Sequence, residues 1–182
     1  MKVAVAQLDT VVGDVRGNLE RIRGAYARAL KEGAEVVLTP ELSLCGYPPR
    51  DLLEQPDFVR ASHEALRALA RETGEAALVV GAPEPNPRGR GRPLFNAAYV
   101  LHGGRVAAKR FKSLLPTYDV FDEERHFEPA RENAPVRFKG RRLGITVCED
   151  AWTDETFWGT RRYRVDPVAR QARAGADVLL NI

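Results

Sequence analysis

Apolar and polar residues follow one another along the chain in two rhythms, one typical of strands and one typical of helices. Short apolar runs rich in β-branched residues predict strands at residues 2–8, 35–40, 76–83 and 176–182. Longer amphipathic stretches lie between them. This order predicts an α/β fold in which at least part of the sheet is parallel.

Two other segments predict β-hairpins. Residues 96–109 read "NAAYVLHGGRVAAK", and His102-Gly103-Gly104 at the centre would supply the positive φ angles of a tight turn. A second hairpin is expected around Lys139-Gly140, joining residues 135–138 to residues 141–148. Part of the sheet structure is therefore expected to be antiparallel.

The amphipathic stretches predict three helices. The first has about four turns, ends before Gly33 and turns four apolar residues toward a sheet: Leu19, Ile22, Tyr26 and Leu30. The other two helices are expected at residues 58–73 and 165–174. Residues 88–93, rich in Gly, Arg and Pro, predict an exposed loop.

The composition adds limits to this picture. A chain of 182 residues suits a single domain, here residues 1–182, and 44% hydrophobic with 29% charged residues is typical of a globular protein. Lys and Arg exceed Asp and Glu by only 28 to 25, and the basic clusters "RGRGR" and "RRYR" are brief. We interpret both clusters as solvated loops, so no nucleic-acid partner is expected.

No signal-peptide pattern follows Met1, and no apolar run approaches the roughly 18 residues that span a membrane. A cytoplasmic protein without a membrane partner is therefore expected. The two cysteines, Cys45 and Cys148, lack the spacing of a zinc site or a disulfide framework, so both should be free thiols, and no metal site is expected.

The chain ends in an apolar strand at Ile182, with nothing after it to cover the sheet. We therefore expect a domain that is cut short at its C-terminus. The apolar surface left uncovered predicts a homo-oligomer.

Three residues with reactive side chains stand where strands are expected to end. Glu41 follows the strand at 35–40, Lys112 follows the first hairpin, and Cys148 ends the second hairpin. Functional residues gather at the carboxyl ends of parallel strands, where loops are open to ligands. Each residue also has an interpretation without function. Glu41 would be a carboxylate at the start of a helix, Lys112 a surface lysine and Cys148 a small buried hydrophobic residue.

The sequence around these residues favours the reactive reading. "TPELSLCGYPPRDLL", "KRFKSLLPTYDVFDEERHF" and "GITVCEDAWTD" occur in this order and resemble the nitrilase superfamily of carbon–nitrogen hydrolases. The longer two resemble, more narrowly, the glutamine-hydrolysing domains of glutamine-dependent NAD synthetases. The resemblance extends from end to end of the chain and implies an α-β-β-α sandwich, incomplete at the C-terminus.

The resemblance also implies roles for the three residues. Cys148 is then the nucleophile, Glu41 the general base, and Lys112 the cation beside the oxyanion, with the backbone N–H of Glu149 as a second donor. A thiol attacks an amide as thiolate, so it needs a base or a neighbouring cation. The histidines lie in a helix, a turn and a polar loop, which argues against a Cys-His pair.

By the same resemblance, Tyr118, Glu149 and Trp152 line the pocket for L-glutamine. Tyr118 and Trp152 are equally explained as core aromatics, whereas adjacent buried carboxylates at Glu149 and Asp150 are costly in a core. The family also places a second glutamate near the catalytic group, and Glu123 or Glu124 would occupy that region.

The chain departs from the family pattern in two respects. The small-residue run and the arginine that hold the glutamine's α-amino and carboxylate groups in the family would lie beyond Ile182, and no Ser-Gly-Gly phosphate loop is present. The synthetase domain is therefore expected to be absent, so no cofactor is expected here, and ATP and Mg belong to the synthetase half. Three hypotheses stay open: a glutaminase serving a synthetase domain or chain, another small-amide hydrolase, and an inactive fragment or interaction module.

Overall fold

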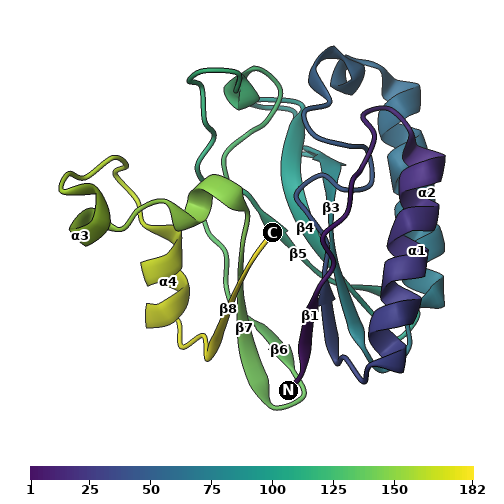
Figure 1. Cartoon of the computed structure of the whole chain (residues 1–182). Helices are drawn as coiled ribbons and strands as arrows, with labels where there is room; N and C mark the ends of the chain where they lie inside the picture. The colour runs from purple at the N-terminus through teal and green to yellow at the C-terminus, as the bar shows by residue number, and fades with distance from the viewer.

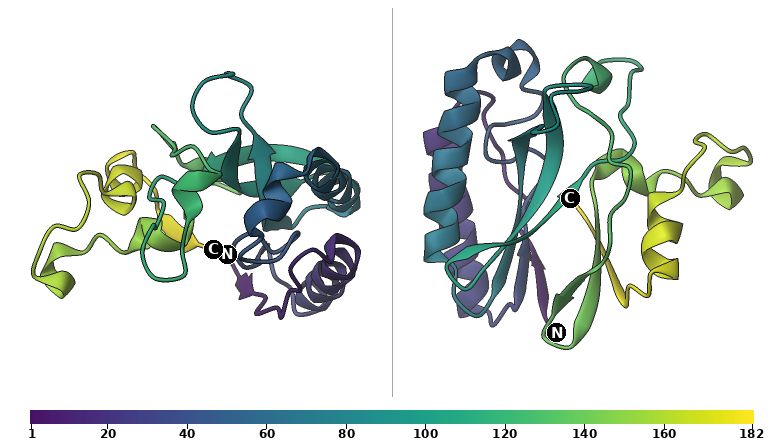
Figure 2. Two further views of the ribbon diagram at one scale, coloured as in Figure 1. Left: turned by 90° about the horizontal axis from the view of Figure 1, so that it is seen from above. Right: turned by 180° about the vertical axis from the view of Figure 1, so that it is seen from behind.

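The computed structural model describes residues 1–182 and contains two β-sheets packed face to face with helices on their outer sides (Figure 1). Seen from above, the layers run helix, sheet, sheet, helix (Figure 2). This is the α-β-β-α arrangement that the family resemblance implied. None of the helices combines the length and apolar character that crossing a bilayer requires.

The larger sheet is built from the first two-thirds of the chain. Its order is β1 (Val3–Val5), β2 (Val36–Leu38), β3 (Ala77–Pro85), β4 (Leu94–His102) and β5 (Arg105–Phe111). The first three strands are parallel, and β4 and β5 add antiparallel pairs at one edge. The smaller sheet has the order β6 (Val136–Phe138), β7 (Arg141–Thr146) and β8 (Val178–Asn181), with β6–β7 antiparallel and β7–β8 parallel.

The helices cover both outer faces. The larger sheet carries α1 (Val15–Lys31) and α2 (Pro56–Glu72), and the smaller carries α4 (Pro167–Arg173), while the short α3 (Glu155–Trp158) projects from the body (Figure 1). Three 3₁₀ turns lie in the loops: η1 (Arg50–Glu54), η2 (Glu123–Arg125) and η3 (Cys148–Ala151).

Two apolar layers hold the sandwich together. One lies between α1, α2 and the larger sheet and includes Ile22, Leu69 and Leu78. The other fills the space between the two sheets, where Val79 of β3 and Ile145 of β7 belong to the same buried cluster. The facing sheets therefore fix the loops at their ends relative to one another, and these loops carry the candidate site.

The predicted elements are present with shifted bounds. Both hairpins are confirmed, and positive φ angles fall on Gly103 and Gly104 in the first and on Lys139 and Gly140 in the second. The strand predicted at residues 2–8 is shorter, since β1 spans Val3–Val5.

The prediction that Leu30 faces the sheet was wrong, because its side chain is 43% exposed. Residues four apart in a helix are rotated by about 40° relative to each other. In the series Ile22, Tyr26 and Leu30, the third residue therefore lies about 80° from the first and outside the buried face. Ala29, seven residues after Ile22, packs against the core instead.

Gly81 of β3 lets the segment that carries Glu41 pack directly onto the sheet. A Cβ at this position would lie 2.2 Å from the backbone nitrogen of Leu42 and 2.9 Å from the carbonyl carbon of Glu41. We expect Gly81→Ala to destabilise the fold by about 1–3 kcal/mol, because backbone must move to admit the methyl group. Urea unfolding measures this loss.

Gly74→Ala is the matched control, since a Cβ at Gly74 meets nothing within 4 Å. Its free energy of unfolding should change by less than about 0.5 kcal/mol. Equal stability of the two variants would contradict the close approach at Gly81.

Candidate active site

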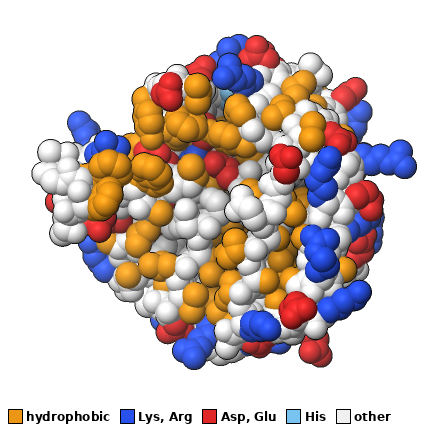
Figure 3. All heavy atoms as spheres, in the orientation of Figure 1, with side chains coloured by type: hydrophobic (Ala, Val, Ile, Leu, Met, Phe, Trp, Pro, Cys, Tyr) orange, Lys and Arg blue, Asp and Glu red, His pale blue; other side chains and the backbone are white.

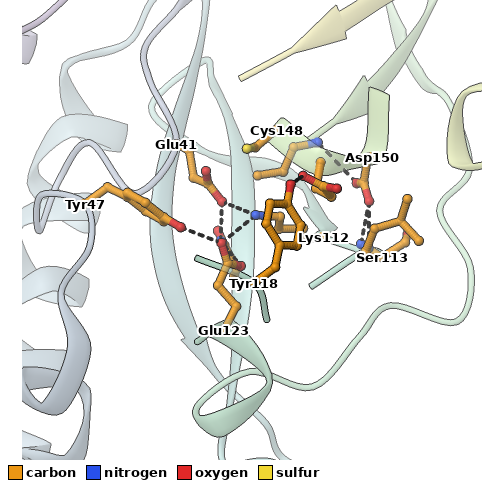
Figure 4. A network of polar contacts seen from close by, with 12 residues as sticks. Glu41, Tyr47, Lys112, Ser113, Tyr118, Glu123, Cys148 and Asp150 are labelled. Carbon is orange, nitrogen blue, oxygen red and sulfur yellow. Dashed lines mark hydrogen bonds and ion pairs between the residues drawn. The ribbon is translucent and has the colours of Figure 1, made fainter. Parts of the chain in front are cut away.

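The three reactive residues predicted from the sequence lie in one cluster at the ends of the strands (Figure 4). Lys112, directly after β5, places its Nζ 2.7 Å from Oε1 of Glu41, which follows β2. The lysine side chain is 0% exposed, which excludes the interpretation of Lys112 as a surface lysine. An ammonium group without access to water is retained only where carboxylates pair with it.

Glu123 of η2 provides the second carboxylate. Its Oε1 lies 2.6 Å from Nζ of Lys112, whereas the neighbouring Glu124 is exposed. The structure thus selects Glu123 from the two glutamates that the family resemblance proposed. Tyr47, in the "GYPPRDLL" motif, donates its hydroxyl to the same Oε1 at 2.9 Å.

Asn96 of β4 links the two glutamates, and it was not among the residues predicted from the sequence. Its Nδ2 donates to Glu41 at 2.6 Å and to Glu123 at 3.3 Å. Oε1 of Glu41 therefore receives both Lys112 and Asn96, and the other oxygen is left for a further partner. An asparagine between the apolar residues Phe95 and Ala97 of this strand was the available signal for this role.

Cys148 faces this cluster from the second sheet. It begins η3, and its φ of +44° is a left-handed conformation that L-residues other than glycine rarely adopt. Its N–H donates to the carbonyl of Ile182 at 2.7 Å. The backbone therefore turns sharply at the cysteine, and its side chain is only partly buried.

The cavity beside the thiol has a volume of about 360 Å³. Glu41, Cys148 and Trp152 line it together with the ends of β1, β2 and β8. No histidine contributes to this lining, as expected from the sequence. A small polar molecule in this cavity would lie against both the thiol and the carboxylate.

Burial, together with the neighbouring charges, decides the protonation of the thiol. Burial, followed by the nearby negative charge of Glu41, raises the pKa of Cys148 to about 12, although Lys112 opposes the shift. The resting group is thus a neutral thiol at neutral pH. Burial alone would lower the pKa of Lys112, but Glu41 and Glu123 outweigh it and raise that pKa, so the lysine stays charged. Burial and Glu41 raise the pKa of Glu123.

The three residues predicted to line a substrate pocket lie near one another. Tyr118 donates its hydroxyl to Oε2 of Glu149 at 2.9 Å, and Glu149 is buried. Tyr118 is 46% and Trp152 44% exposed, so the core-aromatic reading was wrong for both side chains. Tyr163 also donates its hydroxyl to Oε1 of Glu149, although "RRYR" was expected in a solvated loop.

Exposed hydrophobic side chains lie on the face of the molecule that Figure 3 shows. Figure 3 shows hydrophobic side chains at the surface near α3 and again along the face between β8 and β1. The exposed members include Val120, Phe157, Val5 and Leu179. Trp158 stacks on Trp152 with ring centroids 5.6 Å apart.

Asp51, Glu54 and His126 form the group of side chains whose spacing would suit a metal ion. Both carboxylates are exposed, and the guanidinium of Arg125 lies 3.1 Å from each of them. This positive charge already pairs with the two acids. In the cluster of Glu41, Glu123 and Lys112, the ammonium of Lys112 likewise pairs with both carboxylates.

The chain is similar in sequence to proteins of known family. The model of the carbon–nitrogen hydrolase family matches residues 2–171. The glutamine-dependent NAD(+) synthetases of Synechocystis sp. and Aquifex aeolicus are 40% and 34% identical to the chain over 99% and 100% of its length. The chain spans about a third of the length of these curated relatives.

Solved structures lead to the same group. The glutamine-dependent NAD+ synthetase of Acinetobacter baumannii superposes with a TM-score of 0.86 and 28% identity, over 99% of this chain and 31% of that one. An amidase from Nesterenkonia sp. superposes with a TM-score of 0.75 and 31% identity, over 100% of this chain and 64% of that one. A glutamate-to-glutamine variant of this amidase carries acrylamide added at its active-site cysteine.

Proposed function

Because the chain belongs to the carbon–nitrogen hydrolase family, we propose that it hydrolyses the side-chain amide of L-glutamine through a thioester on Cys148. The ammonia then serves the ATP-dependent amidation of deamido-NAD to NAD, carried out by a synthetase domain or a separate synthetase chain. The names of the relatives support this choice of substrate and partner. Only the synthetase step is proposed to use ATP and Mg.

The observation that carries the proposal is the meeting of Glu41 and Lys112 from the larger sheet with Cys148 from the smaller one. Lys112 and Glu41 are 2.7 Å apart, and Glu41 and Cys148 line the same cavity. Glu41 and Cys148 supply a base and a nucleophile beside one small cavity, and Lys112 supplies a cation bound to the base. These are the groups that amide hydrolysis requires.

The first half of the reaction forms the thioester. Since the thiol is neutral at rest, Glu41 accepts its proton as Sγ attacks the amide carbon. The negative charge on the amide oxygen then lies beside the ammonium of Lys112 and the backbone N–H of Glu149, which stabilise it. Glu41 passes the proton to the amide nitrogen, the carbon–nitrogen bond breaks, and ammonia leaves.

The second half releases glutamate. Glu41 accepts a proton from water as the water oxygen attacks the thioester carbon. The carbon–sulfur bond breaks, and the sulfur regains a proton from Glu41. Lys112 stays protonated throughout because two carboxylates hold its charge.

The test is release of ammonia from L-glutamine, measured beside a panel of small amides such as acetamide and propionamide. We expect glutamine to have the highest kcat/KM. The absence of ammonia from every amide would overturn the hydrolase proposal.

A second candidate is hydrolysis of another small amide, and the similarity to the Nesterenkonia amidase favours it. A small amide with a higher kcat/KM than glutamine would support this candidate. A chloro-ketone analogue of glutamine separates the glutaminase from the third hypothesis, an inactive module, because alkylation of Cys148 requires a reactive thiol beside a glutamine pocket.

Glu149→Gln is expected to raise the KM for glutamine about 10-fold to 100-fold, with a smaller change in kcat. Its carboxylate accepts hydrogen bonds from Tyr118 and Tyr163, and it lies next to the nucleophile in the chain. A charged acceptor binds a polar group of the substrate more strongly than an amide does.

Steady-state kinetics with glutamine and acetamide measure this effect, and Tyr163→Phe is the comparison variant because it keeps the carboxylate. Acetamide hydrolysis should change little in Glu149→Gln. An unchanged KM for glutamine would remove Glu149 from the pocket.

The cytoplasmic location and the homo-oligomer remain predictions from the sequence. Val5 is 74% exposed on the edge strand β1, and Leu179 on β8 is also exposed. Large apolar residues at two sheet edges favour burial against another surface.

A further inference from the structure

Asp150, two residues after the nucleophile, is fully buried and accepts three backbone hydrogen bonds. Its Oδ1 accepts the N–H groups of Ser113 and Leu114, both at 2.9 Å. Its Oδ2 accepts the N–H of Val147 at 3.2 Å. These contacts are visible in Figure 4, where Asp150 lies between Ser113 and the backbone next to Cys148.

The donors come from two different sheets. Ser113 and Leu114 directly follow Lys112 at the end of β5, whereas Val147 directly precedes Cys148 at the end of β7. One carboxylate thus joins the loop that carries the cation to the turn that carries the nucleophile. We propose that Asp150 is a positioning residue for the amide hydrolysis: it holds Cys148 and Lys112 at the relative positions that the reaction requires. This inference rests on the proposed function.

The backbone around Cys148 shows why a support is needed there. The positive φ of the cysteine is an unfavourable conformation that neighbouring contacts must maintain. Asp150 contributes twice, because its own N–H donates to the carbonyl of Val147 at 3.0 Å while its side chain accepts the N–H of the same residue. Val147 is therefore held from both of its backbone groups.

The loop that begins at Lys112 needs a similar support. The backbone N–H of Lys112 donates to the carbonyl of Asn96, and the carbonyl of Lys112 accepts the N–H of Ala130, both at 2.8 Å. Beyond Lys112 the chain leaves the sheet, and Asp150 accepts the next two N–H groups. Without this acceptor, the buried N–H of Leu114 and the part-buried N–H of Ser113 would be left without a partner, and the loop would move to satisfy them.

The variant Asp150→Asn has nearly the same shape and tests the proposal. An asparagine can accept the N–H groups of Ser113 and Leu114, but its NH₂ then opposes the N–H of Val147. We expect kcat for glutamine to fall about 100-fold while KM changes less than threefold, because small displacements between reacting groups lower the rate rather than the affinity.

The pH profile adds a readout that a purely structural role would not move. Burial raises the pKa of Asp150 to about 6. The three backbone donors and the charge of Lys112 lower this pKa but do not outweigh burial. The native chain should lose kcat as the pH falls through about 6, since the carboxylate takes up a proton there. The asparagine variant has no such charge, so this limb should be missing from its profile.

Asp154→Asn is the matched control. Asp154 lies four residues further along and also accepts backbone N–H groups, from Thr156 at 2.8 Å and Phe157 at 3.3 Å, but it is exposed and contacts neither loop. Its kcat should stay within twofold of the native value. If Asp150→Asn behaves like this control in kcat and pH profile, the proposal is overturned.

Two further measurements cover other outcomes. If Asp150→Asn does not fold, replacement of the Leu114 amide by an ester removes one donor and no side chain, and a kcat within twofold of native would overturn the proposal.

If the native chain hydrolyses no amide, the proposed function fails separately. The rate of Cys148 alkylation by iodoacetamide then decides, with at least tenfold slowing in Asp150→Asn in support and an unchanged rate against.

Discussion

Replacing Cys148 with alanine is expected to lower kcat for glutamine hydrolysis by about 10⁴-fold or more. The variant lacks the atom that forms the thioester, and what remains is binding and the donors around the oxyanion. The cavity should still admit glutamine, because its other lining residues are unchanged. Ammonia release under saturating glutamine measures the loss of kcat, and calorimetry measures the retained binding.

Cys45→Ala is the matched control for this prediction. Burial raises the pKa of Cys45 to about 12, the same value as for Cys148, so thiol acidity does not distinguish the two cysteines. Their surroundings do, since Cys45 is fully buried among apolar residues such as Leu42 and Leu53. Its loss should lower stability and leave kcat nearly unchanged. Equal activity of native and Cys148→Ala protein would rule out the thioester.

The positions of the candidate residues at strand ends could be predicted because strands have strong sequence patterns. The apolar runs before Glu41 and Cys148 are β2 and β7, and packing of the two sheets brings their ends together. Their catalytic assignment came from the family resemblance, since each residue alone had an equally ordinary explanation.

What the sequence could not show depends on side chains meeting across the fold. Lys112 follows Lys109 and Arg110 and looks like a surface residue, yet it turns inward where β5 ends and is fully buried. Asn96 donates to Glu41, 55 residues away in the chain, and Asp150 accepts the N–H groups of Ser113 and Leu114, 37 and 36 residues away. Local periodicity carries no information about such pairs.

The second large effect is expected from Lys112→Met, which should lower both activity and stability. Removal of the ammonium leaves the buried carboxylates of Glu41 and Glu123 without a cation, which costs about 3–5 kcal/mol of unfolding free energy for a broken buried ion pair. Loss of the oxyanion partner should also lower kcat by about 10³-fold. Urea unfolding and ammonia release measure the two effects separately.

The stability loss should depend on pH with a definite sign. Burial and Glu41 raise the pKa of Glu123 in the folded chain even with the lysine present, and without it the folded state binds protons still more readily than the unfolded state. Stability then falls as the pH rises. The loss relative to the native protein should therefore be larger at pH 8 than at pH 5.

A double variant separates the structural role of Lys112 from its catalytic one. Lys112→Met combined with Glu123→Gln removes one buried cation and one of the two carboxylates that it holds. Much of the lost stability should return, because only Glu41 stays without a cation, whereas activity should not return, because nothing positive faces the oxyanion. Full stability of the single variant at pH 8 would show that the two carboxylates do not need the ammonium. Recovery of kcat in the double variant would show that the lysine's charge acts on the fold and not on the reacting amide.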